Sequence, residues 1–227
     1  MHILLILLLL LGLLTLPSFW VRRVMKKYSQ PEDRYPGSGA DLARRLLDEH
    51  GLNSVAVEVT DSGDHYDPED RCVRLTSDKY HGRSLTAITV AAHEVGHALQ
   101  DHSGYQPLKL RTHLVRLAGP AQKLGATLLF AAPVLVLLTR ALPLSLLMFV
   151  GGLLTLGFAT IIHFVTLPTE WDASFGRAMP LLQAGEYLYP VDVPHARRLL
   201  LAAAMTYVAA SLMSLLNIGR WWAILRR

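Results

Sequence analysis

Four long apolar runs constrain the fold of this chain more than any other feature of its sequence. They occupy residues 3–16, 124–138, 142–165 and 199–216; hydrophobic residues make up 52% of the 227-residue chain and charged residues only 18%. Such runs are typical of transmembrane helices, because a helix needs about 20 apolar residues to cross a bilayer. We therefore predict a mainly α-helical, multi-span membrane protein with about four transmembrane helices and one modest polar region.

Basic residues predict how these spans are oriented. A cluster directly follows the first run: Arg22, Arg23, Lys26 and Lys27. The positive-inside rule then places the N-terminus outside and this cluster in the cytoplasm. The net charge of +4 suits anionic lipid headgroups better than nucleic acid, so we expect the lipid bilayer as a partner and no nucleic acid. Cys72 is the only cysteine, which excludes an intrachain disulfide and a cysteine-based zinc site.

The polar region contains an H-E-x-x-H motif, His93-Glu94-Val95-Gly96-His97. It lies in a helical pattern over residues 84–102, with Ser84 as the predicted N-cap. Residues four apart lie on one face of a helix, so His93 and His97 are placed to bind one ion. Glu94 is then placed to polarise a water molecule, and a third ligand must come from elsewhere. The alternative is a polar helix face with two exposed histidines.

Shorter elements surround the motif helix. We predict a helix over residues 39–50 and two strands over residues 55–59 and 72–75, which are expected to pair in a small hairpin or sheet beside the motif helix. An exposed strand edge binds an extended peptide through its backbone. Residues 71–75 are our candidate for such an edge, with substrate-binding residues Arg71, Val73 and Leu75.

Glu170 is the candidate third ligand. Two predicted spans separate it from the motif, and an even number of spans returns the chain to the same side of the bilayer. Glu170 is the first carboxylate after the third apolar run, in a helix predicted to begin at residue 168 or 169. A glutamate near a helix N-terminus is also favoured by the helix dipole alone. The residues by themselves leave both interpretations open.

These observations divide the chain into five predicted segments: an N-terminal membrane anchor (1–28), a cytoplasmic-face catalytic region (29–119), a transmembrane hairpin (120–166), a third-ligand segment and loop (167–198), and a C-terminal membrane helix and tail (199–227).

The motif and residues 166–174, Thr-Leu-Pro-Thr-Glu-Trp-Asp-Ala-Ser, together resemble the YugP-like neutral zinc metallopeptidases of bacteria. The resemblance implies a zincin-like helical core in the bacterial inner membrane, one catalytic Zn²⁺, and Glu170 as third ligand. A more distant likeness is to membrane zincins of the HtpX and CAAX-prenyl-protease type, whose later motif is E-x-x-x-D. Here the fourth residue after Glu170 is Ser174, and the acid is Asp172, so both are candidates for orienting the ligands.

We therefore expect a zinc endopeptidase that hydrolyses peptides or membrane proteins at the cytoplasmic membrane face, with Glu94 as general base. A second group often stabilises the oxyanion, and the candidates are Tyr207, His65, Tyr66 and Arg177. Two alternatives stay open: a non-catalytic zinc-binding membrane scaffold or adaptor, and an intramembrane metalloprotease.

Overall fold

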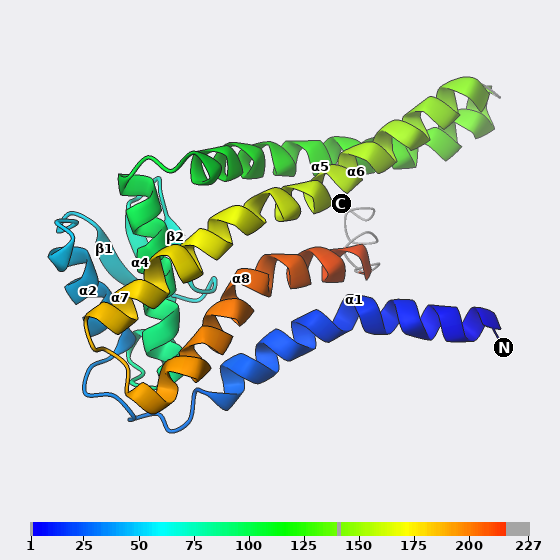
Figure 1. Cartoon of the computed structure of the whole chain (residues 1–227). Helices are drawn as coiled ribbons and strands as arrows, with labels where there is room; N and C mark the ends of the chain where they lie inside the picture. Colours follow the sequence, from blue (N-terminus) through cyan, green and yellow to red (C-terminus); the bar gives the residue numbers. More distant parts are fainter. Residues whose placement is uncertain (1, 140–141, 217–227) are drawn as a thin grey trace. The chain divides into compact units, whose positions relative to one another are not determined.

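A computed structural model describes the backbone of residues 2–139 and 142–216 (Figure 1). Its longer helices are α1 (His2–Lys27), α2 (Gly39–Glu49), α4 (Leu85–His102), α5 (Gln106–Thr139), α6 (Leu142–Trp171) and α8 (Val193–Leu216). Shorter elements are the strands β1 (Ala56–Thr60), β2 (His65–Asp67) and β3 (Cys72–Thr76), the helices α3 (Ser77–Tyr80) and α7 (Met179–Ala184), the π-helix η1 (Asp172–Ala178) and the 3₁₀-helix η2 (Pro190–Asp192).

The chain forms two compact units. Of the described residues, one unit comprises 2–15, 110–139, 142–166 and 207–216, and the other comprises Leu16–Lys109 and Leu167–Thr206. The H-E-x-x-H motif and Glu170 both belong to the second, which we call the site unit. The observed fold is thus mainly helical, as expected, and the site unit contains the small sheet.

The expectation of about four transmembrane helices is wrong. Over the residues that the structure describes, no helix is both long enough and apolar enough to cross a membrane. Part of the apolar sequence instead fills the interior of the site unit, since Leu199, Leu200, Ala202 and Ala204 of α8 are all fully buried. An apolar run of limited length is also what a buried core helix requires. The predicted membrane orientation, with the N-terminus outside, was derived from these spans and is therefore no longer supported.

The sheet has the strand order β1-β3-β2, with β1 parallel and β2 antiparallel to β3. The predicted strands over residues 55–59 and 72–75 are confirmed and pair with each other, whereas β2 was not predicted. β3 is therefore the central strand, and the prediction of residues 71–75 as a peptide-binding edge is wrong. Both backbone edges of β3 are already hydrogen-bonded, and Val73 and Leu75 are buried while Arg71 precedes the strand.

Helix α4 is the central element of the site unit (Figure 1). Ser84 caps it as predicted, because its side-chain oxygen accepts a hydrogen bond from the backbone N–H of Ala87. Every residue from Leu85 to Gln100 is buried, because α2, α3, the sheet, η1 and α7 all contact this helix. A helix enclosed on all sides presents the motif to the protein interior rather than to solvent.

Candidate metal centre

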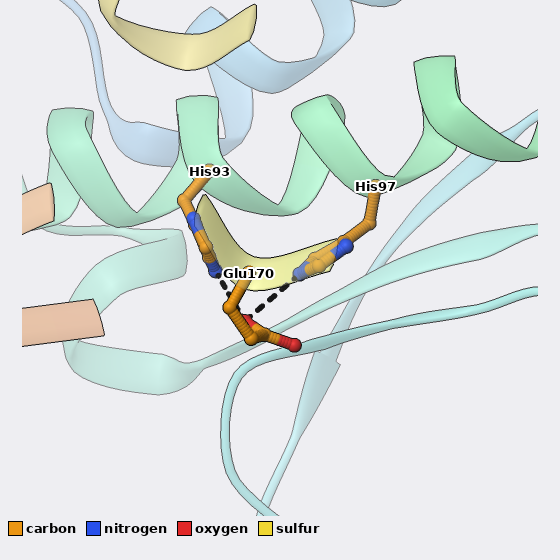
Figure 2. Close-up of side chains that lie close together, drawn as sticks. All are labelled: His93, His97 and Glu170. Carbon is orange, nitrogen blue, oxygen red and sulfur yellow. Dashed lines mark ion pairs between the residues drawn. The ribbon is translucent and has the colours of Figure 1, made fainter. Parts of the chain in front are cut away.

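Three side chains from two helices meet beside α4. The Nε2 atoms of His93 and His97 each lie 3.3 Å from the same carboxylate oxygen of Glu170. One ligand atom from each residue lies within 4.8 Å of the others, and all three residues are buried. Figure 2 shows both imidazole rings descending from α4 toward the carboxylate, which comes from the end of α6. The structure thus brings together the three residues predicted as ligands.

His93 is oriented through its other ring nitrogen. Its Nδ1 lies 3.0 Å from the hydroxyl oxygen of Ser174, and that hydroxyl donates its own proton to the backbone carbonyl of Leu200. A serine hydroxyl has only one proton to donate. The Ser174 oxygen must therefore accept from His93, so Nδ1 carries the ring proton and Nε2 presents its lone pair to Glu170.

His97 is fixed in the same tautomer by Gln100. The side-chain nitrogen of Gln100 donates to the carbonyl of Thr169 and to the carboxylate of Asp172, each at 2.8 Å. Both partners can only accept, which fixes which end of the amide is oxygen. That oxygen lies 2.9 Å from Nδ1 of His97. His97 Nδ1 therefore carries the proton, and its Nε2 also presents a lone pair.

The donor set fits a zinc ion. Two lone pairs and a carboxylate oxygen facing one another repel unless a cation lies between them. Ligand atoms about 2.0–2.1 Å from a tetrahedral zinc are about 3.3 Å apart, which matches both Nε2–carboxylate distances.

The remaining predicted site residues lie in different places. Glu94 is buried on α4, and it lies between His93 and His97 in the sequence. Arg177 forms an ion pair with Asp172, with 2.9 Å between its Nε and the carboxylate, and also donates to the hydroxyl of Ser103. Its guanidinium thus supports Asp172, which differs from the oxyanion role considered from sequence.

The other oxyanion candidates have contacts of their own. His65 bonds through Nδ1 to the carbonyl of Gly63, 2.8 Å away. Tyr66 donates its hydroxyl to Asp101 at 2.9 Å, and burial together with that acceptor raises its pKa. The side chain of Tyr207 lies outside the described part of the chain. These contacts do not test whether any of these residues stabilises an oxyanion, so the oxyanion roles stay predictions.

Gln100 is the residue of the centre that sequence reasoning missed. It is fully buried and follows His97 by three positions, so it lies on the same helix face. A glutamine in a buried stretch is unusual, because a polar side chain must find partners there. This spacing was the available signal, although the sequence does not show that Thr169 and Asp172 are the partners.

Fold and site together define a helical metalloprotein whose centre combines a His-x-x-x-His pair on one helix with a glutamate from another. A family model described as "Putative neutral zinc metallopeptidase" matches residues 2–226, and the chain belongs to this family. "Putative membrane protease YugP" of Bacillus subtilis (strain 168) is 38% identical over 214 residues, covering 93% of this chain and 91% of that protein. No solved structure matches the chain. The resemblance seen in the sequence is confirmed, and the cofactor of the family is zinc.

Proposed function

We propose that this chain is a zinc-dependent endopeptidase in which His93, His97 and Glu170 hold the ion and Glu94 is the general base. The observation that supports this most is the convergence of the three ligand atoms within 4.8 Å of one another. The position of Glu94 adds to it, because this carboxylate follows the first ligand directly and is itself buried, with 6% of its surface exposed.

The chemistry follows from the residue types. When bound, zinc lowers the pKa of a coordinated water toward about 7 and polarises a carbonyl group. The Glu94 carboxylate accepts a proton as the water oxygen attacks the peptide carbonyl carbon. It then passes that proton to the amide nitrogen as the C–N bond breaks. Ser174 and Gln100 keep the imidazoles oriented throughout, since each holds the Nδ1 proton of one histidine.

We also propose that the substrates are peptides or membrane-protein segments met at the cytoplasmic surface of the bacterial inner membrane. The Bacillus subtilis relative is named a membrane protease, which supports this location. The exposed basic residues at the end of α1 suit it as well, namely Arg22, Arg23, Lys26 and Lys27. Anionic lipids of the cytoplasmic leaflet attract such clusters.

The decisive experiment compares Glu94→Gln with wild-type protein. We expect the variant to retain zinc, because its three ligands are untouched, and to lose at least about 10²-fold in peptide cleavage, because the proton acceptor is gone. Zinc content is measured by metal analysis. Cleavage is measured by comparing the peptide fragments that accumulate in membrane and soluble fractions of cells producing each form.

Two further variants complete the design. Glu170→Gln should lose zinc and activity together, whereas Glu32→Gln, which changes an exposed carboxylate of the same unit, should change neither. If wild type and Glu94→Gln accumulate the same fragments while both bind zinc, the peptidase proposal fails and a zinc-binding scaffold is favoured. Fragments confined to the soluble fraction would contradict the membrane location of the substrates.

A further inference from the structure

The side chain of Gln100 joins the two helices that supply the metal ligands. Its oxygen contacts His97 on α4, and its nitrogen contacts the backbone carbonyl of Thr169 at the end of α6. Thr169 directly precedes Glu170 in the chain. One buried amide therefore sets the tautomer of one ligand and the position of the backbone that carries another.

The amide is itself held in a closed ring of interactions. Gln100 donates to Asp172, and Arg177 pairs with the same carboxylate oxygen. Arg177 also donates to the hydroxyl of Ser103, and that hydroxyl donates to the backbone carbonyl of Gln100. Every donor in the ring faces an acceptor, so a rotation of the Gln100 amide by half a turn would set its oxygen against two other acceptors.

We propose that Gln100 is the positioning residue of this metal centre: it locks His97 as the Nδ1–H tautomer and fixes the spacing between His97 and Glu170, with Asp172 and Arg177 locking Gln100 in turn. This inference rests on the zinc site of the proposed function. It goes beyond that function, because it assigns a role to a residue that makes no direct contact with the ion or the substrate.

The tests use zinc affinity, from competition with a chromophoric chelator, and the tautomer of His97 in zinc-free protein, from ¹⁵N NMR of the ring nitrogens. Gln100→Met keeps the side-chain length and removes all three hydrogen bonds. We expect it to weaken zinc binding about 10- to 100-fold, as loss of a partner of a ligating histidine does. We also expect His97 to populate both tautomers.

Gln100→Glu separates the two parts of the role. A carboxylate still accepts from His97 Nδ1–H, so the tautomer should stay as in wild type. It cannot donate to Thr169 or Asp172, so zinc binding should still weaken. Adding Asp172→Asn supplies an amide donor in place of the repelling carboxylate, and the double variant should bind zinc more tightly than Gln100→Glu alone.

Thr89→Val is the matched control. Thr89 lies on the same helix, is buried, and its hydroxyl has no hydrogen-bond partner among the described residues. This variant should bind zinc within about twofold of wild type, since it removes no partner of a ligand.

The outcomes separate the two proposals. A wild-type protein that does not bind zinc contradicts the metal centre itself. A wild type that binds zinc, with Gln100→Met binding within about twofold of it and retaining a single His97 tautomer, overturns the role of Gln100. If Gln100→Met does not fold, judged by its circular dichroism, the comparison of Gln100→Glu with its double variant decides: no recovery of zinc affinity overturns the proposal.

Discussion

At the scale of single residues, the centre uses neutral partners to orient both histidines. Ser174 accepts from His93 and Gln100 accepts from His97, whereas many metal-ligating histidines donate to a carboxylate. The carboxylate of Asp172 accepts a hydrogen bond from Gln100, and Gln100 in turn contacts His97. The site therefore keeps one negative charge, that of Glu170, in direct contact with the ligand nitrogens.

Replacing Ser174 by alanine tests the orientation of His93. The variant leaves the Nδ1 proton of His93 and the carbonyl of Leu200 without their shared partner in a fully buried position. We expect zinc affinity, measured by chelator competition, to fall about 10-fold. Thr206→Ala is the control, because among the described residues its hydroxyl donates to the carbonyl of Ala202 within its own helix and to no metal-ligand partner. Equal losses in both variants would argue against an effect specific to His93.

At the scale of elements, α4 packs closely against η1, the segment that directly follows Glu170 and the end of α6. Gly96, inside the motif, faces the backbone of Ala173 so closely that an added Cβ would lie 2.6 Å from its carbonyl oxygen. The π-helical geometry of η1 brings two of its polar side chains together near the metal centre. Residues five apart lie over one another in a π-helix, and this places Arg177 against Asp172.

Gly96→Ala should therefore separate the two elements. The clash is with backbone, which cannot rotate away, so we expect a loss of about 1–3 kcal/mol in the free energy of unfolding. Zinc affinity should fall with it, because Glu170 moves with the segment that must shift. Gly119→Ala in α5, where an added Cβ meets nothing within 4 Å, should leave the free energy of unfolding unchanged or raise it by up to about 1 kcal/mol.

At the scale of the whole molecule, a buried carboxylate ties the segment after α1 to the start of α8. Asp192 accepts from Arg34 at 2.8 Å and from the hydroxyl of Tyr35 at 2.6 Å. Burial would raise the pKa of Asp192, but these hydrogen bonds outweigh it and lower the pKa below its ordinary value. A carboxyl whose pKa is lower in the folded state stabilises the fold when ionised.

The pH dependence of this contribution has a defined sign. It is fully present above the unfolded-state pKa of about 3.9, and it is lost as the pH falls through the lower, folded-state pKa. Asp192→Asn should cost about 1–3 kcal/mol in the free energy of unfolding at pH 7. The difference from wild type, measured by denaturant unfolding, should shrink below about pH 4. A difference that stays constant from pH 7 to pH 3 would contradict this role.

Sequence patterns predicted the secondary-structure elements that depend on interactions between residues close together in the chain. The cap at Ser84, the motif helix and two of the three strands were all anticipated, since capping and periodicity act over a few residues. The structure brings Glu170 to His93 and His97, as predicted, although the supporting argument about membrane spans does not hold and the family resemblance carried the choice. In the structure, α4 packs closely against η1 at Gly96, directly after the end of α6 that carries Glu170.

Sequence alone determined the chemistry of the site: two imidazoles one turn apart, an adjacent carboxylate and a family resemblance that names the metal. Tertiary structure decided what long-range packing controls. It made β3 the central strand instead of an edge, buried part of the last apolar run in the protein interior, and joined Gln100 to Thr169 and Asp172. The physical reason is that strand order and the partners of a buried amide depend on contacts between residues distant in the chain, which local patterns do not encode.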